Sequence, residues 1–208
     1  MNNNYSIEGI FATPIYRAKL ENIPLNFQKM TQKYINGGMI KNYGNYVSSD
    51  TDIIDQPDAL EVKNFCQFHL DNFYKTVFGD VSKKTKKIIT QSWYNMNRKN
   101  EFHHEHTHQN SIVSGVFYVN TSPKDKIKFI NFKYDQINVC DTDPLPTPFN
   151  SVETDFNVST GDLLLFPSST YHSVPIILED DRIRISMAFN TFIKGTIGDY
   201  VKMTQLKL

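Results

Sequence analysis

The stretch GDLLLFPSSTYHSVPIILEDDRIRISMAFN, residues 161–190, decides the fold of this chain of 208 residues. Gly161 and Asp162 predict a turn, 163–166 reads as a buried strand, and Pro167 ends that strand. His172 opens the next strand. From 182 to 190 apolar and polar residues alternate, which is the pattern of a strand with two different faces. Strand follows strand here with short turns between them, so this part of the chain predicts antiparallel β structure.

The pattern of successive short strands begins at residue 87, whereas the chain before that residue is predicted to contain helices. We predict strands at 87–97, 111–120, 126–133, 151–158, 162–166, 172–178 and 182–193. Before them we predict short strands within 7–19, helices at 24–36 and 57–78, and loops at 38–52 and, further on, 135–150. Helices followed by strands indicate a mainly β (α+β) fold backed by N-terminal helices. We expect a single domain over 1–208, with supporting elements at 1–86, the β core at 87–194 and a C-terminal tail at 195–208.

Composition excludes several function classes. Lys plus Arg and Asp plus Glu each number 22, so no strong electrostatic grip on nucleic acid or anionic lipid is expected. No stretch has the roughly 20 apolar residues of a membrane span, and no signal peptide is evident. Cys66 and Cys140 show no paired spacing, which suits a reducing compartment. We therefore expect a cytoplasmic protein.

Four of the six histidines fall within EFHHEHTHQNS, at positions 103, 104, 106 and 108. Histidine is the commonest side-chain metal ligand, so the cluster indicates a metal site rather than a solvated polar loop. In an extended chain, residues two apart share a face. His104, His106 and His108 should then share one face, and His103 and Glu105 the other. Both the His106-x-His108 pair and the His103-x-Glu105 pair remain possible ligands.

The strand at 182–190 offers the rest of a ligand site. An isolated strand of this pattern would turn its polar side to water. In a small barrel backed by helices the apolar side can pack on the helices instead, and Arg184 and Ser186 would point into a cavity. A guanidinium and a hydroxyl together suit a carboxylate. His172 is the candidate third metal ligand, because its strand can run beside the histidine cluster.

Three stretches together resemble a known family. They are FATPIY at 11–16, SWYNMNRKNEFHHEHTHQNSIVSGVFYVN at 92–120, and the stretch at 161–190 quoted above. The chain resembles 2-oxoglutarate- and iron(II)-dependent oxygenases of bacteria and tailed phages, which are distant relatives of prolyl 4-hydroxylases. The resemblance implies a double-stranded β-helix (a jelly roll, cupin-like), hydroxylation of a substrate with release of succinate and CO2, and the host cytoplasm as location if the gene is a phage's.

The resemblance also implies residue roles. It places Fe(II) on His106, His108 and His172, and 2-oxoglutarate on Arg184 and Ser186, with O2 as the other co-substrate. The wider superfamily has a carboxylate where His108 stands, so we expect weaker iron binding, and the His103-x-Glu105 alternative stays open.

Other residues are predicted from strand parity. Asn95 and Tyr118 are expected to line the cavity near the co-substrate. Ser114, Asn190, His104 and Glu105 are expected near the site without a firm role, whereas Trp93 is expected in the core.

Two other functions are compatible with these residues. One is a three-histidine metal cupin dioxygenase that does not use 2-oxoglutarate, and the other is a non-catalytic jelly-roll binding module. The substrate can be a small molecule or a peptidyl residue, and a homodimer through strand edges is compatible with the pattern.

Overall fold

The computed structural model describes residues 9–81, 84–131, 145, 147–179 and 182–208. Parts of the expected strands 7–19 and 126–133, most of the expected loop 135–150, and Cys140 lie outside these residues.

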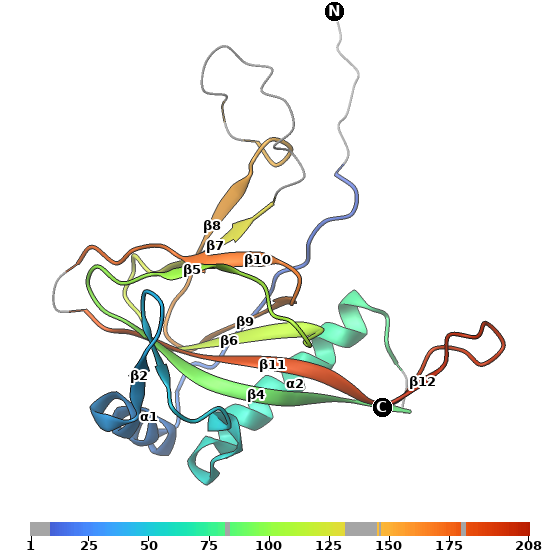
Figure 1. Ribbon diagram of the computed structural model, residues 1–208, viewed down its shortest axis with the longest axis horizontal. Coiled ribbons are helices and arrows are strands. Elements are labelled where there is room, and N and C mark those ends of the chain that lie inside the picture. Colours follow the sequence, from blue (N-terminus) through green and yellow to red (C-terminus); the bar gives the residue numbers. More distant parts are fainter. Residues whose placement is uncertain (1–8, 82–83, 132–144, 146, 180–181) are drawn as a thin grey trace, which may run out of the picture.

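Two antiparallel sheets face each other (Figure 1). The larger, eight-stranded sheet runs in the order β1 (Tyr16–Lys19), β9 (Asp162–Pro167), β6 (Val113–Asn120), β11 (Arg184–Ile197), β4 (Thr85–Asn97), β3 (Tyr46–Ser48) and β2 (Met39–Lys41), with β12 (Leu206–Lys207) paired to β11. The smaller sheet runs in the order β5 (His103–His106), β10 (Tyr171–Val174), β7 (Lys126–Ile130) and β8 (Glu153–Asn157). Successive strands alternate between the sheets along most of the core, which is the double-stranded β-helix that the resemblance implied.

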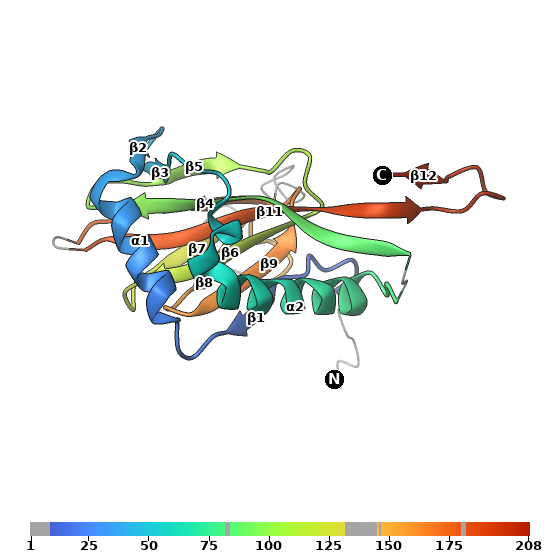
Figure 2. The same ribbon diagram turned by 90° about the horizontal axis from the view of Figure 1, so that it is seen from below.

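The helices cover the outer face of the larger sheet. They are α1 (Leu25–Gly37) and α2 (Leu60–Val77), the latter preceded by the short 3-10 turns η1 (Ile53–Asp55) and η2 (Pro57–Ala59). Figure 2 shows both helices on one side of β4, β11, β6 and β9, with β5 on the other side of the sheet. The main core lies between these helices and the sheet, and Phe27, Leu70, Phe73 and Phe117 are fully buried in it. The expected helices at 24–36 and 57–78 are confirmed.

The central strand β11 explains why the polar face of this sheet can point inward. Its apolar side chains, Ile185, Met187 and Phe189, belong to the core under the helices. Arg184 and Ser186, on the opposite face, are 2% and 5% exposed because the smaller sheet covers them. The inverted arrangement considered for this strand is therefore the one that occurs.

Close packing between β6 and β11 also explains why residue 115 of β6 is a glycine. A Cβ atom on Gly115 would lie 2.0 Å from the ring of Phe189, its partner in the strand register. Because glycine has no Cβ atom, it alone leaves room for the Phe189 ring to pack directly on β6.

One expectation for the secondary structure was wrong. The segment 38–52, expected as a loop, contains the hairpin β2–β3, which extends the larger sheet beside β4. The segment 103–106, expected to be extended, forms the edge strand β5. The C-terminal segment 195–208 contains the end of β11 and its partner β12, which project beyond the body in Figures 1 and 2.

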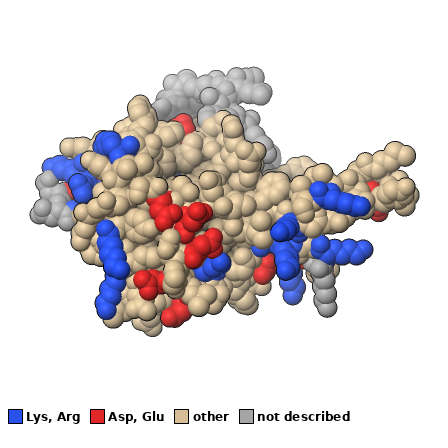
Figure 3. Space-filling view, turned by 60° about the horizontal axis from the view of Figure 1, so that its bottom comes forward, with Lys and Arg blue, Asp and Glu red and all other residues tan. Residues whose placement is uncertain are grey.

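The surface shows no dominance of one charge sign. Figure 3 shows acidic side chains grouped near the middle of one face, with basic side chains on either side of them. Across the part of the chain that the structure describes, no helix is both long and apolar enough to cross a membrane.

Candidate metal centre

A narrow cavity between the two sheets gathers most of the predicted site residues. Its lining comes from β4, β5, β6, β7, β10 and β11, with His108 just beyond β5. The lining residues are Trp93, Asn95, His103, His106, His108, Val116, Tyr118, Ile127, His172, Val174, Arg184, Ser186 and Ala188. A second, outer pocket of about 270 Å³ opens beside it and shares Trp93, His103, His106 and His108 with it. The histidines therefore stand where the inner cavity meets the outside.

His106, His108 and His172 each offer one ring nitrogen, and these three atoms lie within 4.8 Å of one another. His106 and His172 are direct partners across β5 and β10. The ring centroids of His106 and His172 are 4.3 Å apart, and those of His108 and His172 are 5.2 Å apart. Three imidazoles at this separation can bind one metal ion.

Hydrogen bonds fix the orientation of all three rings. The Nδ1 atom of His106 donates to the His104 carbonyl at 2.7 Å, and that of His172 donates to the Thr170 carbonyl at 3.0 Å. The Nδ1 atom of His108 lies 2.6 Å from Oδ1 of Asn190. An oxygen acceptor requires the proton to be on Nδ1, so each ring keeps a lone pair on Nε2. This is the tautomer that a metal ligand needs.

The surroundings also keep these rings neutral. Burial lowers the pKa of His106 to about 4 and that of His172 to about 3. Burial likewise lowers the pKa of His108. Neutral imidazole is the form that binds metal, so little proton release is needed at pH 7.

The segment that carries His108 is tied to the sheets by hydroxyl groups. The backbone nitrogen of His108 donates to the Ser168 carbonyl at 3.0 Å. The Ser168 hydroxyl contacts those of Ser111 and Ser114, each at 2.8 Å. Ser114 therefore supports the loop beside the site and does not line the inner cavity.

The far end of the cavity holds hydrogen-bond donors that lack acceptors. Arg184 is 2% exposed, yet its Nε and Nη1 atoms have no hydrogen-bond partner among the described residues, and the same holds for the buried hydroxyl of Tyr118. Burial raises the pKa of Tyr118, so its hydroxyl stays protonated and remains a donor. A buried group left without a partner costs about 1–3 kcal/mol. Ser186 and Asn95 line the same end, and Ser186 is the register partner of both Asn95 and Tyr118.

Asp125 lies close to Arg184, and the sequence analysis did not predict this neighbour. Asp125 is 3% exposed and forms an ion pair with Arg182, while one of its carboxylate oxygens lies 3.9 Å from Nε of Arg184. One carboxylate thus faces two guanidinium groups. An anion bound at Arg184 would improve this charge balance.

Strand parity failed within the histidine cluster. His172 and Val174 of β10 pair with His106 and His103 of β5, so three steps along one strand match two along the other. This register shift brings His103 to the cavity side, against the parity expectation. Glu105 is exposed and belongs to neither histidine group, so the His103-x-Glu105 pair does not face a common point.

The expectation that Trp93 lies in the core was wrong. It is only half-buried and lines both pockets, and its ring stacks on His108 with centroids 5.7 Å apart. Asn190 was expected nearby without a role, and it holds the ring of His108. Trp93 and Asn190 occupy the same strand faces as Asn95 and Arg184, so the parity of β4 and β11 was the available signal.

The residues fit a metal with a dicarboxylate co-substrate. Three neutral Nε2 atoms at one end suit a first-row metal ion, and unpartnered donors at the other end suit a carboxylate. Fold and site together define a jelly-roll metalloenzyme.

Comparisons with known proteins support the resemblance found in the sequence. The model of the family described as "Putative 2OG-Fe(II) oxygenase" matches residues 91–190, from β4 to β11. This segment of 100 residues, just under half of the chain, contains all the predicted ligands and is similar to the 2-oxoglutarate- and iron(II)-dependent oxygenases. The resemblance is confirmed, and with it the cofactor iron(II) and the co-substrates 2-oxoglutarate and O2. Comparison with the curated proteins finds no match.

Solved structures of low identity share the fold. A prolyl-4-hydroxylase from Pseudomonas putida is 13% identical with a TM-score of 0.52, covering 86% of this chain and 92% of that one. HygX from Streptomyces hygroscopicus, solved with nickel, 2-oxoglutarate and hygromycin B, is 11% identical with a TM-score of 0.54, covering 86% and 82%. A viral collagen prolyl hydroxylase from Paramecium Bursaria Chlorella virus-1 is 10% identical with a TM-score of 0.51, covering 85% and 94%.

Proposed function

We propose that His106, His108 and His172 hold iron(II) through their Nε2 atoms, and that Arg184 binds the far carboxylate of 2-oxoglutarate. The observation that carries this assignment is the pairing of three anchored, neutral imidazoles with a buried guanidinium whose Nε and Nη1 atoms find no acceptor among the described residues. When bound, iron and 2-oxoglutarate would let O2 act as the oxidant: one of its oxygen atoms would enter succinate as 2-oxoglutarate loses CO2, and the other would hydroxylate a substrate C–H bond.

The protein's own residues orient and shield the reactants. The Nδ1 hydrogen bonds hold the three rings in place before metal binds, which reduces the reorganisation needed. Tyr118 and Ser186 add hydroxyl donors beside Arg184, and Asn95 closes the same end of the cavity. Val116, Ile127 and Ala188 provide apolar walls, which limit the water around the reacting groups.

We propose that substrate enters through the outer pocket. Its described lining is Asn42, Val47, Trp93, His103, His104, His106, Thr107, His108 and Asn190. None of these side chains is a carboxylate, an ammonium or a guanidinium. The part of the substrate near the metal should therefore be uncharged, whether it belongs to a small molecule or to a peptidyl residue. The free, buried thiol of Cys66 suits the cytoplasmic location that we propose.

Anaerobic spectroscopy tests the assignment. Protein loaded with Fe(II) and 2-oxoglutarate should show the weak visible metal-to-ligand charge-transfer band of the chelate. Alanine at His106, His108 or His172 should abolish iron binding, and the matched control Glu105→Ala should leave it intact. If Glu105→Ala abolishes binding and His108→Ala does not, the ligand set is wrong.

The same measurement separates the competing functions. Bound iron without the band would favour a three-histidine dioxygenase that does not use 2-oxoglutarate. Absence of bound metal would favour a non-catalytic binding module. Succinate release measured against a panel of small molecules and peptides would then identify the substrate class.

A further inference from the structure

We propose a second metal site, formed by His103, His104 and His106 at the mouth of the cavity, which takes Zn²⁺ and competes with the iron centre for His106. Only the competition between zinc and iron for His106 rests on the proposed function. The binding of zinc by the three residues stands on their own geometry.

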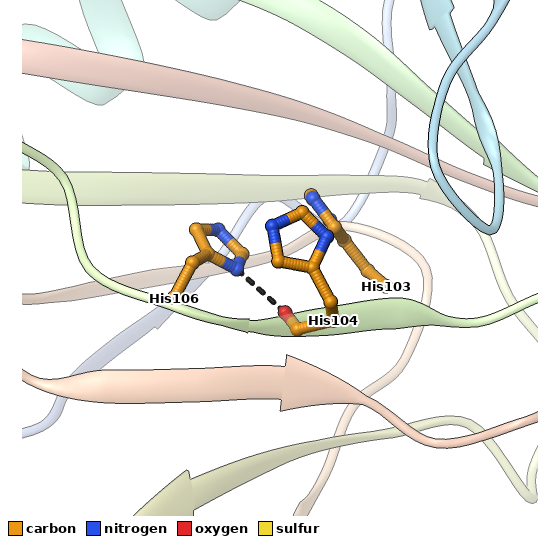
Figure 4. A group of neighbouring side chains, drawn as sticks. All are labelled: His103, His104 and His106. Atoms are coloured by element: carbon orange, nitrogen blue, oxygen red, sulfur yellow. Dashed lines mark hydrogen bonds between the residues drawn. The ribbon is translucent and has the colours of Figure 1, made fainter.

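The three side chains converge on one side of β5. Each offers a ring nitrogen, and these nitrogens lie within 4.8 Å of one another. The ring centroids of His103 and His104 are 5.2 Å apart, those of His104 and His106 are 5.2 Å apart, and those of His103 and His106 are 4.3 Å apart. Figure 4 shows all three rings rising from the same side of the strand.

An unsatisfied atom points to a ligand here. Nδ1 of His104 is buried and has no hydrogen-bond partner among the described residues. The ring of Tyr43 packs edge-on against His104, with centroids 5.7 Å apart. A buried ring nitrogen without a partner is unfavourable, and coordination of a metal would satisfy it.

The donor set selects the kind of ion. Three imidazoles without a carboxylate form a borderline-soft site, which suits zinc and disfavours magnesium and calcium. Three protein ligands leave the fourth tetrahedral position of zinc to water or to a solute. All three residues line the outer pocket, so this position would face the entrance.

His106 cannot serve both sites at once. Its Nδ1 is engaged with the His104 carbonyl, so it has one lone pair to offer, on Nε2. Zinc bound at His103, His104 and His106 would remove one of the three iron ligands and narrow the substrate entrance. The outer site would therefore lower oxygenase activity when zinc is in excess.

Zinc binding is tested first without the iron triad. The double variant His108→Ala/His172→Ala should bind one Zn²⁺, counted by native mass spectrometry and titrated against a chromophoric chelator. Adding His104→Ala should weaken binding by about 100-fold or more, because a lost ligand costs at least as much as a lost outer partner. Circular dichroism would confirm that both variants are folded. No zinc on the folded double variant, or equal binding after His104→Ala, would overturn the site.

Competition is tested in the iron-loaded enzyme. His104→Ala removes the outer site, and the succinate release of each protein with zinc is expressed relative to its own rate without zinc. Inhibition of the unmodified protein should need about tenfold less Zn²⁺ than inhibition of His104→Ala. Equal sensitivity would refute the competition, since zinc would then act only by replacing iron. Because the first test uses no iron, its result is independent of whether the iron triad is correctly assigned.

Discussion

The two faces of β11 are equally buried but serve different purposes. Met187 and Phe189 are fully buried in the hydrophobic core between this sheet and the helices. Arg184 on the opposite face is also almost inaccessible, yet two of its nitrogens have no acceptor in the described part of the chain. The comparison shows that burial alone does not mark a structural residue. Unsatisfied polar atoms distinguish the face that binds a ligand from the face that stabilises the fold.

The largest expected effect is on the apolar face. Phe189→Ala should lower the free energy of unfolding by about 3–5 kcal/mol, because a fully buried ring is lost and the sheet cannot close the cavity. Denaturant unfolding measures this change. If the loss were under 1 kcal/mol, the ring would not be a main stabilising element of this core.

A substitution on the polar face of β11 should weaken co-substrate binding without lowering the free energy of unfolding. Arg184→Met should raise the KM for 2-oxoglutarate by about 100-fold, because a charge-assisted pair of hydrogen bonds is lost. Its free energy of unfolding should be unchanged or slightly higher, because a buried guanidinium with two unsatisfied nitrogens is replaced by an apolar chain of similar length, while Asp125 keeps its ion pair with Arg182. Steady-state kinetics at varied 2-oxoglutarate and denaturant unfolding check the two parts. An unchanged KM would exclude Arg184 as the carboxylate anchor.

A second variant on the polar face tests the orientation of a proposed metal ligand rather than the binding of a carboxylate. Asn190→Ala removes the acceptor for Nδ1 of His108 and should weaken iron binding by about 10- to 100-fold. Iron affinity is measured by chelator competition under anaerobic conditions. Asn190→Asp restores the acceptor and should recover most of the affinity, whereas failure of both variants to change it would mean that His108 is not held by this contact.

The smallest effect concerns pH. Because burial lowers the pKa of His106 to about 4 and of His172 to about 3, the unfolded state binds more protons than the folded state below the ordinary histidine pKa of about 6.5. The metal-free protein should therefore lose a few degrees of Tm as pH falls from 7.5 to 5.5. The variant His172→Gln should show a smaller decrease, measured by differential scanning calorimetry. An identical pH profile for both proteins would contradict this origin.

Much of this arrangement was predictable, because strand periodicity in the central strands is undisturbed. The alternation at 182–190 correctly placed Arg184 and Ser186 opposite the core, and the same parity brought Asn95 and Tyr118 to the cavity. The β2–β3 hairpin was not predictable from a segment rich in Gly, Asn and Ser, because its pairing to β4 supplies the order that local propensity lacks.

The failures within the site have a common cause. Parity describes a regular strand, and β5 is irregular where it pairs with β10. His103 therefore faces the cavity although its position predicts the opposite. Asp125 could not be found from the sequence, because its relation to Arg182 and Arg184 joins segments that are far apart in the chain.

Because of the register shift in β5, the outer histidine cluster can change without a change in the proposed iron ligands. An extra residue between His103 and His106 is what brings an additional imidazole to their side of the strand. Loss of a single codon there would restore regular pairing, leave His106, His108 and His172 in the chain, and remove only the outer cluster. A lineage could thus acquire or discard sensitivity to zinc in one deletion or insertion, without any substitution in the residues that carry out oxidation.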